Sequence, residues 1–340
     1  MKKTIIIAEA GVNHNGDINI AKKLIDFASI SGVDYIKFQT FKANKLVSKE
    51  ANKADYQKKQ TCSKDNFQFN MLKKLELSEK SHYLLIDYCK SKNIKFLSSA
   101  FDVDGLDFLD KLNLDYIKIP SGEITNYNYL KKVSTFQKKV ILSTGMSTMD
   151  EIKKAIDVLI SENLELNDII VLHCNTDYPT PFKDVNLSAM NKIKSELGVD
   201  VGYSDHTLGI EVSLAAVSLG ARVIEKHFTL DKGMDGPDHK ASLMPEELKE
   251  LVRSVRNIEL SLSGNGIKEP SSSEKKNIIA SRKSLFFQKD ISKNQTIKKH
   301  HLKALRPGNG ISPMEINKII GMIVKKDFKN GEMVDYNKLK

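Results

Sequence analysis

The chain carries the stretch VGYSDHTLGIEVSLAAVSLGARVIEKH at residues 201–227. Two short apolar runs, 201–203 and 223–224, flank a helical pattern over 208–219, and each run ends in polar residues, Ser204-Asp205-His206 and Glu225-Lys226-His227. Parallel α/β folds give this pattern when a buried strand, a crossover helix and a second buried strand follow one another. The stretch therefore predicts one unit of a parallel sheet, with polar groups at the carboxyl ends of its strands.

The same pattern recurs along the chain, so that eight apolar runs end in polar residues. The six earlier runs are Thr4–Ala8, Tyr35–Ile36, Phe96–Leu97, Tyr116–Ile119, Val140–Leu142 and Ile169–Leu172. Eight parallel strands that alternate with helices are typical of a (β/α)₈ TIM barrel, whose active site lies at the carboxyl face of the strands. The pattern predicts an α/β fold of this class and a site built from the polar strand ends.

The composition changes after the eighth unit. At 340 residues the chain is long enough for one barrel and a small second domain. We expect the barrel over 1–262, a linker rich in Gly, Pro and Ser over 263–280, and a small, mostly β domain over 281–340 with strands at Ser284–Gln288 and Glu332–Tyr336. The polar segment 41–76 is too long for a plain loop and predicts an insertion over the barrel mouth.

Composition and charge exclude several classes of protein. Charged residues make up 28% and apolar residues 40%, and no apolar stretch approaches membrane-spanning length. Three cysteines form neither a disulfide framework nor a CxxC pair, so we expect a cytoplasmic protein. The net charge of +10 comes from lysines scattered among acidic residues. A solvated surface explains it, and we expect neither nucleic acid nor membrane as a partner.

Two histidines, His206 and His227, end the last two runs. Neighbouring strand ends of a barrel lie within reach of one metal ion, and imidazole suits Mn, Fe, Co or Zn. Two protein ligands leave positions open for water and substrate, as Lewis-acid catalysis needs, and Asp238 could complete the shell through water. The alternative is that both histidines are only hydrogen-bonded at the barrel rim.

Two lysines, Lys37 and Lys118, interrupt strand-like runs, and a buried lysine needs a partner. One interpretation is a carboxylate and phosphate cradle, with hydroxyl donors from Ser121, Ser143 and Ser204. The other is a structural ion pair across the barrel, Lys37 with Glu9 or Lys118 with Glu123. These residues do not decide between the two. Glu9 itself could be a general base, could orient water, or could anchor a lysine.

Taken together, the segments resemble the sialic acid synthase family, which makes N-acetylneuraminate, legionaminate or pseudaminate. The motifs that carry the likeness are AEAGVNHNGD (8–17), KFQTFK (37–42), KIPSGE (118–123), LSTGM (142–146), HCNTDYPTP (173–181), GYSDH (202–206), EKHF (225–228), GPD (236–238) and RPGNGI (306–311). They follow one another in order over nearly the whole chain. As a set they are specific.

The resemblance implies a TIM barrel joined to a small C-terminal domain similar to type III antifreeze protein, the SAF domain. It implies a homodimer in which that domain is swapped and covers the partner's active site. It also implies a transferase that condenses phosphoenolpyruvate with an N-acyl hexosamine, through an open-chain aldehyde polarised by a divalent metal, and releases phosphate. The metal is usually Mn²⁺, with Mg²⁺ or Co²⁺ as alternatives.

Motif matching also implies residue roles. His206 and His227 would hold the metal, and Glu9 would act beside them as the third catalytic residue. The residues implied for phosphoenolpyruvate are Lys37, Ser99, Lys118, Ser121, Ser143, Asn175 and Ser204. Those implied for the sugar are Gln39, Glu123, Tyr178, Asp238 and, from the neighbouring chain, Arg306.

Two segments depart from the pattern of the family. Residues 98–101 read SSAF where STPF is commoner, which keeps the hydroxyl of Ser99 but alters the turn. The order Asn175-Thr176 varies among relatives, which leaves open which of the two faces the ligand.

The sugar is the least determined part of the prediction. We expect N-acetylneuraminate synthase, which uses N-acetylmannosamine, on the strength of the segments YPTP (178–181) and RPGN (306–309). The alternative is N,N'-diacetyllegionaminate synthase, which uses a 2,4-diacetamido-trideoxy-mannose. A remoter alternative is a carbohydrate-binding protein without catalysis.

Overall fold

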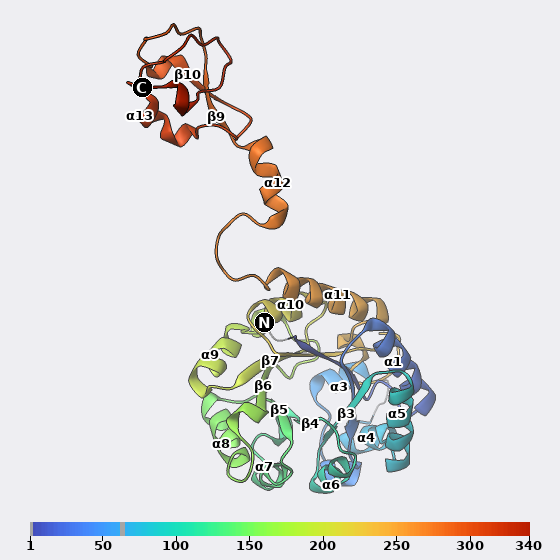
Figure 1. Cartoon of the computed structure of the whole chain (residues 1–340). Helices are drawn as coiled ribbons and strands as arrows, with labels where there is room; N and C mark the ends of the chain where they lie inside the picture. The colour runs from blue at the N-terminus through green and yellow to red at the C-terminus, as the bar shows by residue number, and fades with distance from the viewer. Residues whose placement is uncertain (1–2, 62–64) are drawn as a thin grey trace. The chain divides into compact units, whose positions relative to one another are not determined.

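The computed structural model describes residues 3–61 and 65–340 (Figure 1). The chain divides into two compact units, Met1–Ser263 and Gly264–Lys340, and each is described by itself. Cys62, one of the three cysteines, lies outside the described residues.

In the described part of the first unit, parallel strands close into a barrel in which each strand pairs with the next and the eighth pairs with the first. The strands are β1 (Ile5–Gly11), β2 (Tyr35–Thr40), β3 (Lys95–Ala100), β4 (Tyr116–Ile119), β5 (Lys139–Ser143), β6 (Ile169–Cys174), β7 (Asp200–Asp205) and β8 (Val223–His227). All eight fall on the predicted runs, and the predicted TIM barrel is confirmed.

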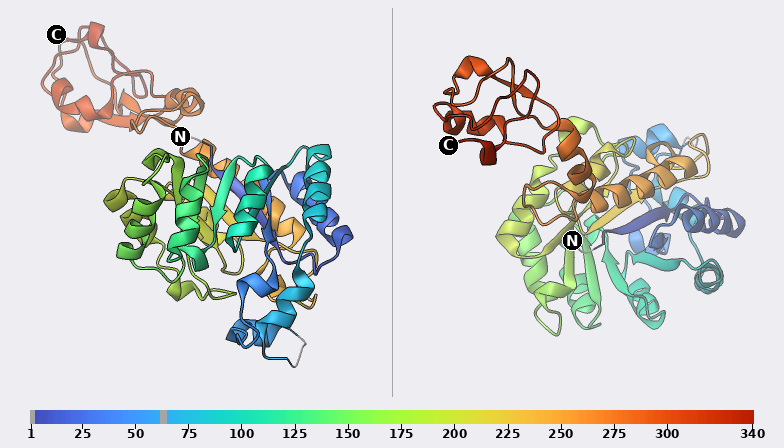
Figure 2. Two further views of the ribbon diagram at one scale, coloured as in Figure 1. Left: turned by 90° about the horizontal axis from the view of Figure 1, so that it is seen from below. Right: turned by 45° about the horizontal axis from the view of Figure 1, so that its top comes forward.

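Helices surround the barrel, as Figures 1 and 2 show. They are α1 (Ile18–Ser31), α5 (Glu79–Ser91), α6 (Val103–Lys111), α7 (Tyr127–Ser134), α8 (Met149–Leu159), α9 (Ser188–Leu197), α10 (Glu211–Ser218) and α11 (Pro245–Ser261). Local sequence sets their ends. Asp17 caps α1 and Gly32, in the left-handed region, ends it, while Thr148 and Glu151 form a capping box on α8.

The strand register brings the polar strand ends to one level. Glu9 lies opposite Lys37 of β2 and His227 of β8. Ser99 pairs with Lys118, and Ser204 pairs with Glu225. Because side chains alternate between the two faces of a strand, residues two apart point the same way. The register therefore gathers side chains from distant parts of the chain at one end of the barrel.

The segment between β2 and β3 contains α2 (Ala43–Leu46), α3 (Asp55–Gln60) and α4 (Gln68–Leu75) before α5 begins. Figure 2 (left) shows it, in blue, projecting beyond one end of the barrel. It packs against the loops after β1, β2 and β3 in a small apolar cluster separate from the main core. The members of this cluster are Val12, Phe41, Leu75, Leu46, Met71, Leu72 and Phe101.

The second unit has its own apolar core, which includes Leu285, Phe287 and Phe328. Its elements are α12 (Ser272–Ser281), β9 (Ser284–Phe287), β10 (Leu302–Leu305) and α13 (Ile316–Ile319), with β9 and β10 antiparallel. Short 3₁₀ turns in the two units complete the described structure: Ser121–Glu123, Leu166–Asp168, Phe182–Asp184, His239–Ala241, Lys299–His301, Pro313–Glu315 and Tyr336–Lys338.

Two details differ from the prediction for this part of the chain. The segment expected to be a linker contains α12, which Ser271 and Glu274 begin with a capping box. Glu332–Tyr336 forms no strand beyond a single bridge between Met333 and Phe286, since Asp335 caps the 3₁₀ turn that follows. The strand paired with β9 is instead β10.

Across the residues that the structure describes, no helix combines the length and the apolar character needed to cross a membrane.

Candidate active site

A cavity of about 790 Å³ opens at the carboxyl ends of the barrel strands. Its volume is in the range of small-molecule sites. Thirteen of the fifteen predicted site residues line it, namely Glu9, Lys37, Gln39, Ser99, Lys118, Ser121, Glu123, Ser143, Tyr178, Ser204, His206, His227 and Asp238. Asn175 and Arg306 are the two that do not.

Two lysines and two glutamates meet at the floor of the cavity. The ammonium of Lys37 lies 2.9 Å from Oε2 of Glu9 and 3.7 Å from Oε2 of Glu225. The ammonium of Lys118 lies 3.6 Å from Oε1 of Glu225. All four side chains are buried, and the group carries two potential charges of each sign. An anion that enters the cavity therefore meets two ammonium groups that are already fixed in place.

Burial and neighbouring charge shift the pKa values of this group in different directions. Burial raises the pKa of Glu9 to about 7, against the opposing effect of Lys37. Burial acts the same way on Glu225, but Lys118 and Lys37 outweigh it and hold its pKa below the usual value. Burial lowers the pKa of Lys118. Of the two carboxyl groups, Glu9 is thus the one suited to exchange a proton near neutrality.

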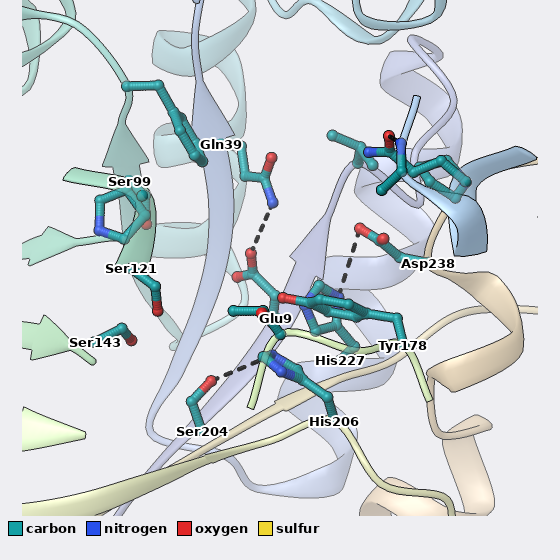
Figure 3. A pocket seen from close by; sticks show the side chains of 18 of the residues that line it. Glu9, Gln39, Ser99, Ser121, Ser143, Tyr178, Ser204, His206, His227 and Asp238 are labelled. Atoms are coloured by element: carbon teal, nitrogen blue, oxygen red, sulfur yellow. Dashed lines mark hydrogen bonds and ion pairs between the residues drawn. The ribbon is translucent and has the colours of Figure 1, made fainter. Parts of the chain in front are cut away.

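Serine hydroxyls surround the two lysines. Lys118 donates to Oγ of Ser143 at 2.7 Å, and Lys37 donates to Oγ of Ser99 at 3.2 Å. Ser204 donates to Glu225 at 3.2 Å. Figure 3 shows Ser99, Ser121, Ser143 and Ser204 along one side of the cavity. Fixed ammonium and hydroxyl donors of this kind suit carboxylate and phosphate groups.

The ion-pair interpretation of the two lysines is right in part, and the cradle stays a prediction. Lys37 makes the expected ion pair with Glu9, but the expected pair of Lys118 with Glu123 is wrong. Glu123 instead accepts a hydrogen bond from Asn126 at 2.7 Å, which draws its carboxylate away from β4. The partner of Lys118 is Glu225, and the ion pairs line the cavity instead of sealing it.

His206 and His227 lie side by side on the other side of the cavity, with ring centroids 5.4 Å apart (Figure 3). Nδ1 of His206 lies 2.5 Å from the carbonyl oxygen of Asn175. A carbonyl only accepts, so Nδ1 carries the proton and Nε2 keeps its lone pair. Burial lowers the pKa of His206 to about 4 and the pKa of His227 well below its usual value. Both rings are neutral at pH 7.

This donor set fits a divalent metal ion. Neutral imidazoles bind metals, and the hydrogen bond from Nδ1 of His206 to the carbonyl of Asn175 fixes the ring so that Nε2 can act as the ligand atom. Nδ1 of His227 is buried without a hydrogen-bond partner in the described residues and lies 3.9 Å from Asp238. Within the same residues, no group of three or more His, Cys, Asp or Glu side chains is placed to hold a metal. Other positions would thus be left to water or substrate.

An aromatic stack backs the histidine pair. The ring of Tyr178 lies 4.1 Å from that of His206 and 5.0 Å from that of Tyr56 on α3. Gln60, also on α3, donates to the carbonyl of Tyr178 at 2.6 Å. The insertion between β2 and β3 is thereby attached to the loop after β6. The insertion also lines part of the cavity. This agrees with the prediction that it lies over the mouth of the barrel.

One predicted ligand residue of the barrel, Asn175, is not part of the cavity lining. The side chain of Asn175 accepts from the backbone of Asp177 at 2.8 Å and shapes the loop, whereas the neighbouring Thr176 lines the cavity. Asn175 is therefore corrected to a loop residue. Arg306 belongs to the second unit, where its Nε donates to the carbonyl of Ser281 at 3.1 Å. Its predicted contact with sugar stays a prediction.

Glu225 is the site residue that sequence reasoning missed. In the sequence it stands with Lys226 and His227 at a strand end, and that position alone predicts no role for it. A signal was present, because Glu225 stands two residues before His227 on one strand and so shares its face. Two buried lysines on other strands also required carboxylates.

Comparison with known proteins identifies the family of the chain. Residues 24–268 match the NeuB family and residues 282–340 match the SAF domain. The chain is 54% identical to an N,N'-diacetyllegionaminic acid synthase of Campylobacter jejuni, over 98% of this chain and 99% of that one. It is 47% identical to a protein of the same description from Legionella pneumophila, over 96% of this chain and 92% of that one.

A solved structure is also similar. The N-acetylneuraminic acid synthetase of Leptospira borgpetersenii matches with a TM-score of 0.71 and 35% identity, over 82% of this chain and 90% of that one. Both the barrel and the small domain thus have counterparts in nonulosonic acid synthases. The chain belongs to the NeuB family and is a carbon–carbon bond-forming enzyme of this synthase class.

Proposed function

We propose that the protein is an N,N'-diacetyllegionaminic acid synthase, which condenses phosphoenolpyruvate with 2,4-diacetamido-2,4,6-trideoxymannose and releases phosphate. The observation that carries the proposal is the 54% identity, over nearly the full length of both chains, to a synthase of that description. This reverses the order of our two predictions from sequence. N-acetylneuraminate synthase becomes the second candidate, supported by the 35% identity to the Leptospira enzyme.

Phosphoenolpyruvate would occupy the side of the cavity that carries the lysines. Its carboxylate and phosphate would share the ammonium groups of Lys37 and Lys118 with the two glutamates, and the hydroxyls of Ser99 and Ser143 would add donors. Hydrogen bonds to charged groups stabilise by about 1.5–3 kcal/mol each. Because these donors are fixed before the substrate arrives, little reorganisation is needed.

The acceptor sugar would lie between the serines and the histidine pair, with Gln39, Tyr178 and Asp238 around it. A divalent metal, Mn²⁺ by the family resemblance, would be held by His206 and His227 and would supply Lewis-acid polarisation of the acceptor aldehyde. The chain's own contribution is to keep both imidazoles neutral, oriented and buried.

The reaction balances with Glu9 as the proton carrier. The methylene carbon of phosphoenolpyruvate bonds to the aldehyde carbon, and the aldehyde oxygen takes a proton. Water adds to the carbon that bears the phosphate, giving up a proton. The tetrahedral carbon then carries both a hydroxyl and the phosphate. Its bond to the phosphate oxygen breaks, the hydroxyl proton passes to the departing phosphate, and a ketone is left. The carboxyl of Glu9, with a pKa raised to about 7 and a contact to Gln39 at 3.4 Å, is placed to take a proton from water and return it to the new hydroxyl.

The swapped homodimer implied by the family remains part of the proposal. Large apolar side chains in the segments that follow β4, β5, β6 and β7 are exposed, namely Tyr127 at the start of α7, Met146, Phe182 and Leu208. A covering domain from a second chain would bury this rim and could bring Arg306 to the site. If Arg306 acts across chains, mixing inactive Arg306→Ala and His227→Ala proteins restores part of the activity. A mixture that stays inactive contradicts the swap.

We place the reaction in the cytoplasm, in keeping with the free thiols of Cys89 and Cys174. The experiment that tests the proposed function is phosphate release from phosphoenolpyruvate with each acceptor, side by side, in the presence of Mn²⁺. We expect a higher kcat/KM with the diacetamido sugar. A higher kcat/KM with N-acetylmannosamine would favour the second candidate instead.

A further inference from the structure

The cavity has an apolar wall that none of the predicted roles uses. Six of the seven members of the small apolar cluster line it: Val12, Leu46, Met71, Leu72, Leu75 and Phe101. Four of the six belong to the insertion between β2 and β3. A cavity that holds only phosphoenolpyruvate and a fully hydroxylated sugar has no need of such a surface, because hydroxyl groups lose hydrogen bonds to water against it.

The wall lies one layer farther out than the reacting groups. Along β2 the inward face runs from Lys37 to Gln39, and Phe41, the residue after the strand, belongs to the apolar cluster. Along β3 the same face runs from Ser99 to Phe101, and the rings of Phe41 and Phe101 meet edge to face at 6.1 Å. From the floor of the cavity to its mouth, the lining therefore changes from charged groups to an amide or a hydroxyl, and then to apolar side chains.

This gradient matches the chemistry of one acceptor class. The aldehyde end must reach the floor, where the histidines and lysines are, so the far end of the sugar points outward. In 2,4-diacetamido-2,4,6-trideoxymannose the far end carries a C6 methyl and the methyl of the 4-acetamido group. In N-acetylmannosamine the same positions carry hydroxyls. Methyl groups gain free energy when an apolar surface buries them, whereas hydroxyl groups lose hydrogen bonds to water there.

We propose that this apolar wall is the specificity determinant of the site, receiving the methyl groups at the C4–C6 end of a deoxygenated, doubly N-acylated acceptor. The inference rests on the proposed function and assigns that substrate preference to Leu46, Leu72 and their neighbours on the insertion. Leu46 and Leu72 are the useful positions to change. Met71 and Leu75 also border a second cavity, so changes there are harder to interpret.

The test replaces leucine by asparagine, which is similar in shape but polar, to give Leu72→Asn and Leu46→Asn. The matched control is Leu84→Asn, at a position on α5 that is 47% exposed and outside the cavity. The conservative variant is Leu72→Met. For each protein, kcat and KM are measured with Mn²⁺, phosphoenolpyruvate and either the diacetamido sugar or N-acetylmannosamine.

We expect Leu72→Asn and Leu46→Asn to raise KM for the diacetamido sugar at least about tenfold, the scale of a lost apolar contact in a binding pocket. KM for phosphoenolpyruvate stays within about twofold, and the preference over N-acetylmannosamine falls. Leu84→Asn keeps both KM values near those of the wild type, and Leu72→Met raises KM for the diacetamido sugar less than Leu72→Asn does. Unchanged acceptor KM, or an equal rise in both KM values, would overturn the role of the wall. A wild-type preference for N-acetylmannosamine would instead overturn the proposed function, before any variant is made.

Discussion

Strands β7 and β8 carry two groups of buried charges, one on each face of the barrel wall. On the outward face, Lys226 and Asp205 form a pair at 3.0 Å with no exposed surface. Asp205 also accepts from Thr207 and Ser213, and Lys226 donates to the carbonyl of Thr207. On the inward face, Glu225 shares two lysines at 3.6 and 3.7 Å, and its Oε2 has no hydrogen bond within the described residues.

The difference separates a structural pair from a binding site. Both groups are fully buried, so burial alone does not distinguish them. The polar atoms of the outward group hydrogen-bond within the group, and neither Asp205 nor Lys226 lines the active-site cavity. The inward group lines a cavity. The contacts of Lys37 and Lys118 with Glu225, at 3.7 and 3.6 Å, are longer than hydrogen bonds, so their ammonium groups keep N–H donors that an anion can engage. Unused capacity beside a cavity is therefore the better sign of function.

The largest expected effect comes from the inward histidines. His206→Ala or His227→Ala should lower kcat/KM on the order of a thousandfold or more, because polarisation of the aldehyde by a bound metal is worth several kcal/mol. Phosphate release measures the loss, and calorimetric titration with Mn²⁺ measures the affinity. Chelation of the metal should abolish the activity of the wild-type protein, and added Mn²⁺ should restore it. If either variant bound Mn²⁺ as tightly as the wild type does, the assignment of the two histidines as metal ligands would be wrong.

The inward lysines come next. Lys118→Met should lower kcat/KM about 10²- to 10³-fold, the effect of removing one fixed electrostatic donor from a site. Its signature is a raised KM for phosphoenolpyruvate, because Lys118 would contact the anion in the proposed site. Steady-state kinetics with each substrate varied in turn measures this. A rise confined to the KM of the sugar would place phosphoenolpyruvate elsewhere in the cavity.

The outward lysine should behave in the opposite way. Lys226→Met leaves Asp205 buried without its cation and should destabilise the fold by about 3 kcal/mol, at the low end for a broken buried pair because Thr207 and Ser213 still donate. Urea denaturation followed by circular dichroism measures the cost. The folded protein should keep its KM for phosphoenolpyruvate. A variant that is as stable as the wild type but has an impaired KM for phosphoenolpyruvate would contradict the distinction between a structural outward face and a binding inward face.

The smallest effect concerns two neighbours after β6. Thr176→Val removes a hydroxyl that borders the cavity and should raise KM for phosphoenolpyruvate about two- to tenfold, the worth of one neutral hydrogen bond. Asn175→Ala should act on the loop, so that its main effect is on thermal stability. Kinetics and a melting curve for each variant compare them. An Asn175→Ala variant with the larger KM effect would reverse our correction.

The barrel could be predicted from sequence because its strands are short apolar runs with distinct polar ends, as in 201–227. Each strand can be predicted from its own residues, because burial on both faces makes parallel strands predominantly apolar. Helix α12 was missed because its Ser-rich start has the composition of a linker, although Ser271 and Glu274 have capping-box spacing. The average composition of the segment predicts a linker, whereas the start of the helix depends on the two capping-box residues alone.

The site could be predicted as a set of residues but not as a set of partners. Lys37 and Lys118 were recognised because lysines inside apolar runs need a partner. Their shared partner, Glu225, comes from β8, and only the closed register makes that contact. The loop role of Asn175 also depends on local geometry, since Asn175 and Thr176 are equally polar in the sequence.

The most direct test of the account is phosphate release by metal-free protein that is given phosphoenolpyruvate and 2,4-diacetamido-2,4,6-trideoxymannose, before and after Mn²⁺ is added. The account predicts no turnover before addition, turnover after it, and none at either stage for His227→Ala. Turnover that is equal with and without the metal, or that survives His227→Ala, would contradict the claim that the inward face of β7 and β8 is the catalytic centre.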